Sequence, residues 1–292
     1  METVRAHNQR NLPVQYAIQT NGLLIDDEWA AFFAQEHFLV GVSLDGDRET
    51  HNAARVTAQD KGTFDAVLRS IDRLRRAGVD FNILCVVTSY TARHAERVYR
   101  FFRRQGFDYL QFIPCLDPLE EERGGYFWSL TPERYASFLT RTFDLWYAEM
   151  AAGKRVSVRN FDNWLGILLG QPPENCAMSG RCAAYFVVEA DGSVYPCDFY
   201  VTDAWRLGNL ANQSLEQLRN SPTAMHFEAQ STVPADCRAC QWYPLCRGGC
   251  RRDRELPDGR VEANVFCSAY QTFFTHAAGR LQQLAQQLSG RR

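Results

Sequence analysis

The sequence has no long apolar run and no excess of charge of one sign. Its 292 residues are 46% hydrophobic and 23% charged, with a formal net charge of −2. A nucleic-acid-binding protein normally carries a basic excess or stripe, so we expect no nucleic-acid partner. No stretch approaches the ~18 consecutive apolar residues that read as a membrane-spanning helix, so we expect no membrane insertion. These absences favour an ordinary globular enzyme.

Several other signals are missing. Residues 1–11 are polar and lack the apolar segment of a secretory signal, and none of the six histidines has a spacing typical of metal ligands. We find no internal repeat and no low-complexity tract. Ten cysteines in such a chain indicate the reducing cytoplasm, where thiols bind metals rather than form disulfides.

The first half of the chain alternates between short apolar runs and amphipathic patterns. The expected strands are residues 14–19, 38–44, 81–87 and 109–113, and the expected helices are residues 26–35, 63–77, 92–105 and 132–151. This order predicts a parallel α/β layer with helical crossovers. Four strands cannot close a barrel, so either the sheet is open or one or two strand–helix units are missing before the first strand.

Eight of the cysteines lie between residues 176 and 267. They are Cys176, Cys182, Cys197, Cys237, Cys240, Cys246, Cys250 and Cys267. Eight soft sulfur ligands suit two four-ligand metal sites, with iron–sulfur clusters as the usual occupants and two structural zinc ions as the alternative. In two-cluster ferredoxins the fourth cysteine of a tight run binds the other cluster. This logic predicts one site from the 237, 240, 246 and 267 thiols and another from the 176, 182, 197 and 250 thiols.

Two glycines and one acid stand next to these cysteines. Gly248 and Gly249 fit a backbone that passes close to a metal cluster without side-chain bulk. Asp198, beside Cys197 and among aromatic residues, is a candidate general base, since partial burial and an anionic cluster would both raise its pKa. A turn aspartate without chemical function is the alternative. Residues 191–192 (Asp-Gly) predict a hairpin turn.

The chain resembles the anaerobic sulfatase-maturating enzymes, radical S-adenosylmethionine (SAM) proteins with a C-terminal SPASM domain. The resemblance rests on QTNGLLIDDEWA, FLVGVSLDG, FNILCVVTS, LQFIPCLDPL, FVVEADGSVYPCDFY and CRACQWYPLCRGGCRR. It implies an α/β fold with a partial (β/α) radical SAM barrel (residues 1–160), a SPASM domain with two iron–sulfur sites (161–268) and a C-terminal helix (269–292).

The resemblance also implies cofactors and site residues. Two auxiliary [4Fe–4S] clusters divide the eight cysteines as the spacing indicates, SAM contacts fall at Ser43, Arg55 and Leu116, and Asp198 is the base. Ser43 and Leu116 lie at predicted strand ends, the edge at which α/β proteins bind ligands. Arg55 lies in a loop without other signal.

The implied reaction oxidises a Cys or Ser of an unfolded sulfatase, in a Cys-x-Pro-x-Arg or Ser-x-Pro-x-Arg motif, to Cα-formylglycine. A 5′-deoxyadenosyl radical takes a hydrogen atom from the target Cβ, the base takes the thiol or hydroxyl proton, and an auxiliary cluster accepts the remaining electron. The implied partners are the sulfatase polypeptide and an electron donor such as flavodoxin or ferredoxin.

The sequence departs from this family in one respect. The 292 residues contain neither the Cys-x3-Cys-x2-Cys motif for the SAM-cleaving third [4Fe–4S] cluster nor the following Gly-Gly-Glu-Pro motif. We therefore expect a chain that cannot cleave SAM alone, as a truncated product, a misplaced start or a gene remnant. Other hypotheses are a different SPASM peptide-modifying enzyme and a non-catalytic iron–sulfur or zinc module that binds peptide.

Overall fold

The computed structural model describes residues 1–119, 121–256 and 259–290. The chain divides into two compact units. Unit 1 comprises Met1–Cys115 and Asp144–Arg159, and unit 2 comprises Leu116–Phe143 and Asn160–Arg292. Each unit is described separately below.

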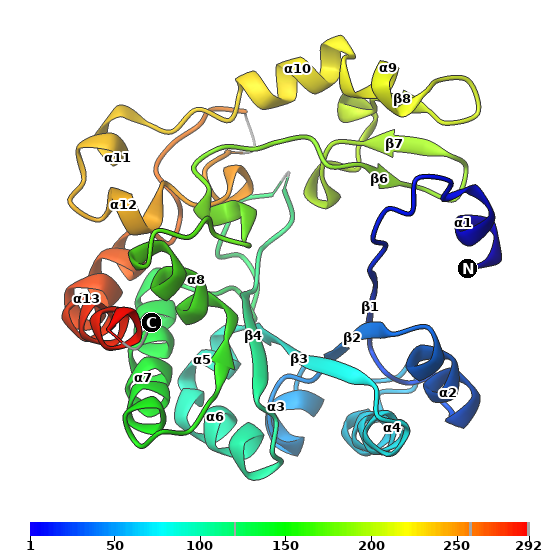
Figure 1. Ribbon diagram of the computed structural model, residues 1–292. Helices are drawn as coiled ribbons and strands as arrows, with labels where there is room; N and C mark the ends of the chain where they lie inside the picture. Colours follow the sequence, from blue (N-terminus) through cyan, green and yellow to red (C-terminus); the bar gives the residue numbers. More distant parts are fainter. Residues whose placement is uncertain (120, 257–258, 291–292) are drawn as a thin grey trace. The chain divides into compact units, whose positions relative to one another are not determined.

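Unit 1 is built on a five-stranded parallel sheet whose strands follow the order of the chain (Figure 1). The strands are β1 (Tyr16–Thr20), β2 (Phe38–Ser43), β3 (Asp80–Val87), β4 (Tyr109–Pro114) and β5 (Ser157–Val158). The predicted parallel α/β layer and its four strands are confirmed. β5 was not predicted, because two residues are too short to show a strand pattern.

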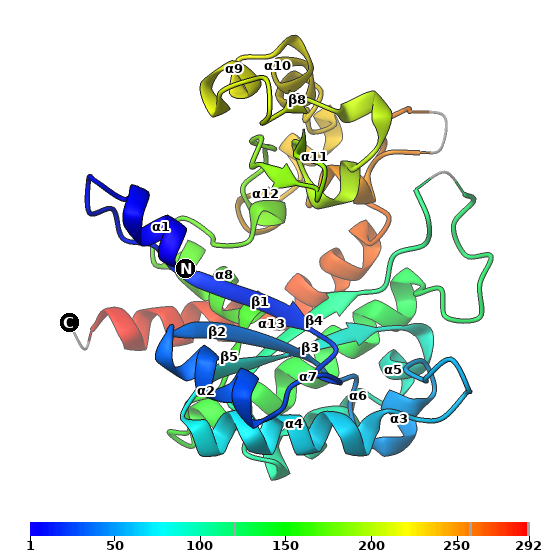
Figure 2. The same ribbon diagram turned by 90° about the vertical axis from the view of Figure 1, so that its right-hand side faces the viewer.

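Helices cover one face of this sheet. They are α2 (Asp27–Gln35), α3 (Arg48–Asn52), α4 (Phe64–Ala77), α5 (Ser89–Arg93) and α6 (Ala95–Arg104). The short helix α1 (Glu2–His7) precedes β1 and buries none of its residues. Figure 2 shows α2, α4 and α6 on the same side of the strands. α2 begins where the Asp26 carboxylate accepts a hydrogen bond from the Trp29 N–H, and α4 ends at Gly78 in a left-handed conformation.

The single helix predicted over residues 92–105 is wrong. The Thr88 hydroxyl caps a first helix, α5, by accepting a hydrogen bond from the Thr91 N–H at 3.1 Å. The chain then leaves helical geometry at His94, with φ −111° and ψ 24°, before α6 starts. The prediction differs from the structure because the Thr88 cap starts a helix before the apolar pattern begins.

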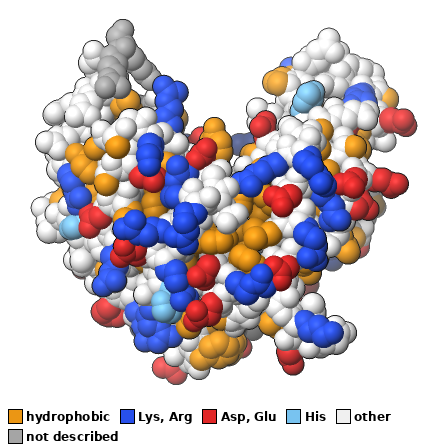
Figure 3. Space-filling model, turned by 90° about the horizontal axis from the view of Figure 1, so that it is seen from below, with side chains coloured by type: hydrophobic (Ala, Val, Ile, Leu, Met, Phe, Trp, Pro, Cys, Tyr) orange, Lys and Arg blue, Asp and Glu red, His pale blue; other side chains and the backbone are white. Residues whose placement is uncertain are grey.

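The core of unit 1 lies between the sheet and α4. Val40 and Val42 of β2 and Ile83 of β3 are buried together with Ile71 and Leu74 of α4. The outer faces carry charged side chains of both signs, which are mixed on the surface seen in Figure 3. This burial fixes the register of β2 and β3, and therefore the positions at which their carboxyl ends emerge.

Unit 2 combines long helices with short, irregular segments. α7 (Pro132–Ala151), whose residues from Asp144 on belong to unit 1, matches the helix predicted at 132–151. α13 (Cys267–Ser289) confirms the expected C-terminal helix, whereas α8 (Arg159–Leu168) was not predicted. A small antiparallel sheet contains β6 (Val187–Val188), β7 (Ser193–Tyr195) and β8 (Gly208–Asn209). The predicted hairpin at residues 191–192 is confirmed, since β6 pairs with β7.

Short helical turns fill the rest of unit 2. They are η1 (Cys176–Met178), η2 (Asp198–Tyr200), η3 (Asp203–Trp205), α9 (Leu215–Arg219), α10 (Pro222–Ala229), α11 (Ala235–Ala239), α12 (Tyr243–Cys246) and η4 (Arg251–Asp253). Among the described residues, no helix has both the length and the apolar character needed to cross a membrane.

An aromatic cluster joins the long helices of unit 2. The ring of Phe273 lies 4.7 Å from that of Trp164 and 5.6 Å from that of Phe143, and it stacks on Phe161 at 5.8 Å. All four side chains are at most 1% exposed. Aromatic packing of this kind anchors α13, whose first residue is Cys267, to α7 and α8.

We predict that Phe273→Ala destabilises unit 2 by about 3–5 kcal/mol, because it leaves a cavity among three buried rings. Urea unfolding followed by tryptophan fluorescence measures the change. Gln282→Ala, at an exposed position of the same helix, is the control and stays within about 0.5 kcal/mol. Equal midpoints for the two variants would contradict this assignment of the core.

Candidate metal centres

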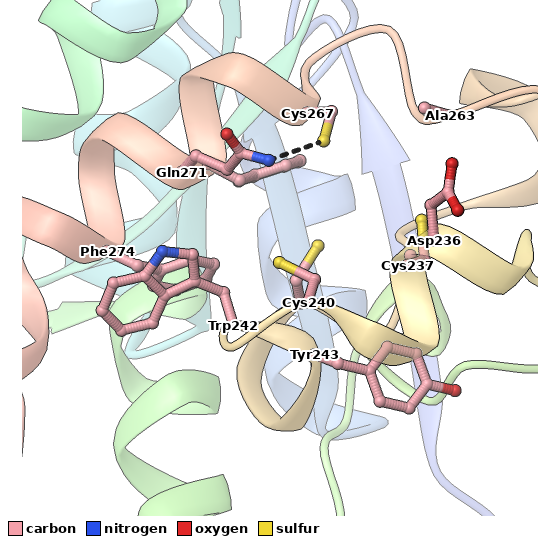
Figure 4. A pocket seen from close by; sticks show the side chains of 12 residues that line it. Asp236, Cys237, Cys240, Trp242, Tyr243, Ala263, Cys267, Gln271 and Phe274 are labelled. Carbon is pink, nitrogen blue, oxygen red and sulfur yellow. Dashed lines mark hydrogen bonds between the residues drawn. The ribbon is translucent and has the colours of Figure 1, made fainter.

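The first cavity lies in unit 2 and is lined by four thiols. Cys237, Cys240, Cys246 and Cys267 surround a volume of about 120 Å³, together with aromatic side chains that include Trp242 and Phe274. Figure 4 shows the labelled cysteines around this space, with Trp242 and Phe274 at one side. These are the four cysteines that the spacing assigns to one site.

Short helices position these thiols. Cys237 lies in α11, Cys240 caps its C-terminus, and Cys246 is the last residue of α12. Cys267 comes from the first turn of α13, where the Gln271 side-chain amide donates a hydrogen bond to its sulfur at 3.6 Å. The fourth thiol is therefore held by the rigid aromatic core, 21 residues after the third in the chain.

The second cavity, also in unit 2, contains the other four thiols. Cys176, Cys182, Cys197 and Cys250 line a volume of about 50 Å³. Two buried arginines, Arg251 and Arg254, line the same cavity, as do Tyr185 and Asp198. The eight thiols are thus grouped as the spacing predicts, while their binding of metal remains a prediction.

A reversal of the backbone separates Cys246 from Cys250. Arg247, Gly248 and Gly249 all have positive φ, at 51°, 83° and 72°. A Cβ on Gly248 would meet the Val233 side chain at 2.7 Å, and one on Gly249 would meet the Asn264 amide at 2.2 Å. Only glycine tolerates such a turn at this packing density, and the turn sends the fourth thiol of the run to the other cavity.

Burial disfavours the ionised thiolate form of these cysteines. It raises the pKa of Cys246 and of Cys197 to about 11, and it raises that of Cys250 further. Bound metal is therefore needed to hold the buried sulfurs as thiolates, because a coordinating cation deprotonates a thiol outright. All ten cysteines are free thiols, which is the state that metal ligation requires.

The spacing of the thiols matters for the kind of metal. Within the described ranges, no three Cys, His, Asp or Glu side chains form a group that could hold a single metal ion. A four-iron cluster has one iron for each of its four cysteine ligands, so these sulfurs surround a volume. Each four-thiol cavity therefore offers the ligand set that an iron–sulfur cluster uses.

Asp198 lies at the rim of the second cavity. The expected partial burial is wrong, because the side chain is exposed at the start of η2, where the chain turns outward after β7. Its Oδ1 accepts a hydrogen bond from the Tyr185 hydroxyl and lies 3.3 Å from the Cys197 sulfur. The acid is thus accessible from solvent and held by Tyr185, a residue that sequence reasoning missed.

The residues expected to contact SAM in unit 1 lie near the carboxyl end of β2. Ser43 is the last residue of this strand, and Asp45 follows two residues later. The Arg55 Nε donates a hydrogen bond to Asp45 Oδ2 at 2.5 Å, and the Val86 N–H donates one to Asp45 Oδ1 at 2.7 Å. Asp45 thereby fixes Arg55 beside the end of the strand that contains Ser43.

The histidine that accepts a hydrogen bond from the Asp45 backbone is itself buried. The Asp45 N–H donates a hydrogen bond to Nδ1 of His51 at 3.2 Å, and burial together with the charge of Arg55 lowers the pKa of His51 to about 4. The imidazole is therefore neutral and accepts through Nδ1. Leu116, half-buried, follows β4 and is the first residue of unit 2.

Comparison with protein families gives the class of the protein. Residues 2–102 match the radical SAM superfamily, and residues 176–241 match the SPASM iron–sulfur cluster-binding domain. The second match includes three of the four cysteines of the second cavity and two of the four of the first. The protein therefore has both radical SAM and SPASM domains, and these imply SAM and iron–sulfur clusters as cofactors.

Comparison with individual relatives identifies the family within this class of proteins. A cysteine-type anaerobic sulfatase-maturating enzyme of Clostridium perfringens (strain 13 / Type A) is 47% identical over 98% of this chain and 78% of the relative. A serine-type enzyme of Bacteroides thetaiotaomicron is 31% identical over 92% of this chain and 69% of the relative. The chain belongs to the family of anaerobic sulfatase-maturating enzymes.

Solved structures agree with this assignment. Native anSMEcpe with bound AdoMet and Cp18Cys peptide superposes with a TM-score of 0.96 at 46% identity, over 98% of this chain and 80% of that one. Streptococcus suis SuiB bound to S-adenosylmethionine has a TM-score of 0.56 at 13% identity, which shows a shared fold only.

We predict that the 292-residue chain, reconstituted anaerobically, binds about eight irons and eight sulfides. Cys246→Ser and Cys250→Ser should each remove about half of the iron, because each variant disables one cavity. The double variant should bind almost none. Iron and sulfide analysis with electron paramagnetic resonance (EPR) measures the outcome.

The control is Cys85→Ala, which changes a thiol that is 1% exposed in β3 and is no part of either cavity. It should leave iron content unchanged. Two zinc ions without sulfide in the wild-type chain, or loss of all iron in either single serine variant, would contradict the two-cavity assignment.

Proposed function

We propose that this protein oxidises a cysteine side chain in a sulfatase polypeptide to Cα-formylglycine. The main support is the difference in identity between two groups of relatives. Cysteine-type enzymes are 44–47% identical to this chain, whereas serine-type enzymes are 30–31% identical. The client would carry a Cys-x-Pro-x-Arg motif and would be bound unfolded, with the target side chain accessible.

The proposed cofactors follow the layout of the chain. Two auxiliary [4Fe–4S] clusters would occupy the two cavities within a SPASM domain of residues 161–268, between a partial barrel (1–160) and a C-terminal helix (269–292). Ser43, Arg55 and Leu116 would contact SAM. When bound, SAM and the cluster that cleaves it supply a 5′-deoxyadenosyl radical, which takes a hydrogen atom from the target Cβ.

Asp198 is the proposed base, and its role is to take the thiol proton of the target cysteine. Transfer of the remaining electron to an auxiliary cluster would leave a thioaldehyde, which water would hydrolyse to the formylglycine aldehyde with release of hydrogen sulfide. Its exposed side chain is accessible to a peptide, and its Oδ1 is held by the Tyr185 hydroxyl. Among the described residues, Oδ2 meets no protein donor, so this oxygen is available to accept the proton. A carboxylate held at one oxygen and free at the other suits proton transfer, which requires correct orientation before basicity.

The remaining partners are proposed from the chemistry. Radical SAM cleavage consumes one electron, so a low-potential donor such as flavodoxin or ferredoxin is required. A protein with ten free thiols suits the reducing cytoplasm. We propose neither a nucleic-acid partner nor a membrane partner, because the net charge is −2 and the chain has no basic excess.

The direct test uses a form of the protein in which a segment with the Cys-x3-Cys-x2-Cys motif precedes these 292 residues, reconstituted anaerobically with iron, sulfide, SAM and dithionite. It is incubated with two peptides that differ only in Cys or Ser at the target position. Mass spectrometry should detect formylglycine, formed at least about tenfold faster from the cysteine peptide. A thioether crosslink instead would indicate another SPASM peptide modifier, and no product would overturn the proposal.

We predict that Asp198→Asn lowers turnover in this assay by about 10²-fold or more, because the amide cannot accept the thiol proton. Iron content should stay at the wild-type value. The matched control is Asp203→Asn, an exposed aspartate in η3 of the same unit, which should leave the rate unchanged. Wild-type turnover in Asp198→Asn, or loss of iron, would rule out this role.

A further inference from the structure

Four consecutive charged residues are buried directly after Cys250. Arg251, Arg252, Asp253 and Arg254 are 2%, 5%, 6% and 2% exposed. A run of this composition normally lies at the surface, since charged side chains are rarely buried unless they are paired. The partners of these four side chains therefore decide whether the run is neutral or carries a net charge.

One of the three arginines is neutralised within the protein. Arg251 donates to Glu255 at 2.8 Å, and its guanidinium lies over the rings of Tyr200, Trp205 and Phe227. This cation therefore has both a carboxylate partner and an aromatic environment. It contributes little net charge to the cavity that it lines.

The other charges do not cancel. Arg252 and Arg254 are buried with one carboxylate, that of Asp253, whose side chain is held by the Asn264 amide at 3.3 Å. Arg123 adds a further cation, donating to the backbone carbonyls of Arg252 and Asp253 at 2.9 Å. The neighbourhood is thus net positive, and buried unbalanced charge is costly unless an anion is close.

Among the described residues, Arg254 is the cation of this run that lines the second cavity without a carboxylate partner. It lines the second cavity, and its guanidinium donates to the backbone carbonyls of Ser231 (3.3 Å), Thr232 and Cys250 (3.4 Å). Within the part of the chain that the structure describes, it meets no carboxylate at ion-pair distance. Arg254 and the thiols of Cys182 and Cys250 line this same cavity, so the guanidinium lies close to the sulfur ligands of the second set.

We propose that Arg254 raises the reduction potential of the auxiliary cluster in the second cavity by holding an uncompensated positive charge at its wall. The inference deepens the proposed function, since it rests on the [4Fe–4S] cluster proposed there for this cavity. Arg254 would stabilise the reduced cluster, because that form carries one electron, and therefore one negative charge, more than the oxidised cluster. No bond is formed or broken and no proton is transferred, because the guanidinium stays protonated throughout.

The role assigned here is electrostatic and differs from that of a structural tie. Arg254 also connects residues 231–232 to Cys250 through carbonyl hydrogen bonds, so its loss could loosen the loop. Arg254→Gln removes the charge and keeps an amide donor. Arg254→Lys keeps the charge but loses the planar guanidinium. The two variants separate charge from geometry.

The experiment is a mediated redox titration of the reconstituted 292-residue chain with dithionite, followed by EPR and without SAM or peptide. We expect Arg254→Gln, at wild-type iron content, to lower the ratio of reduced to oxidised cluster about tenfold at a fixed potential. That change corresponds to a midpoint about 59 mV lower for a one-electron couple. Arg254→Lys should remain close to wild type.

The matched control is the double variant Arg251→Gln/Glu255→Gln. It removes a guanidinium that lines the same cavity together with its carboxylate partner, and so removes no net charge. Its midpoints should stay near those of wild type. An equal decrease in this control would mean that packing, not charge, sets the potentials, and would overturn the inference.

The other outcomes also decide the question. Fully loaded Arg254→Gln with unchanged midpoints overturns the inference while leaving the proposed function intact. If Arg254→Gln fails to bind iron and Arg254→Lys binds it with wild-type midpoints, the charge is required and the inference holds. If both fail to bind iron, Arg254 is a structural residue. Zinc in the wild-type chain would overturn the proposed function first, and this inference with it.

Discussion

The balance between buried thiols and buried guanidinium groups is the constraint on which unit 2 depends. Four thiols line each cavity, and a net positive run of four residues is buried directly beside the second. Burial penalises unpaired cations, and buried thiols stay neutral, so without metal they supply no negative charge to balance the guanidinium groups. Metal-bound thiolates supply that charge, which is how metal binding becomes part of folding.

This constraint explains why so much of unit 2 has little regular structure. A core cluster around its small sheet contains only Val194, Leu207, Leu218 and Ala224, with two partly buried neighbours. The helices between Cys176 and Cys267 are short, the longest being α10 with eight residues. Ligands must therefore hold these segments in place of a large apolar core. The positive-φ reversal at Gly248 and Gly249 then decides which thiol serves which cavity.

Features set by local pattern could be predicted from the sequence. The apolar runs indicated four of the five strands, and cysteine spacing indicated the two sets of four thiols. Features that depend on tertiary contacts could not be predicted from the sequence. Nothing local to Arg55 shows that Asp45 holds it, and a run such as Arg251–Arg254 resembles a solvated surface until its burial is seen. The exposure of Asp198 likewise depends on where the chain turns after β7.

The central claim is that each four-thiol cavity holds one iron–sulfur cluster. Anomalous diffraction from crystals of the anaerobically reconstituted protein, recorded on both sides of the iron absorption edge, tests it most directly. The account predicts one compact group of iron peaks among Cys237, Cys240, Cys246 and Cys267 and a second among Cys176, Cys182, Cys197 and Cys250. Data recorded on both sides of the zinc edge complete the test: a single peak in each cavity that appears only above the zinc edge would contradict the account.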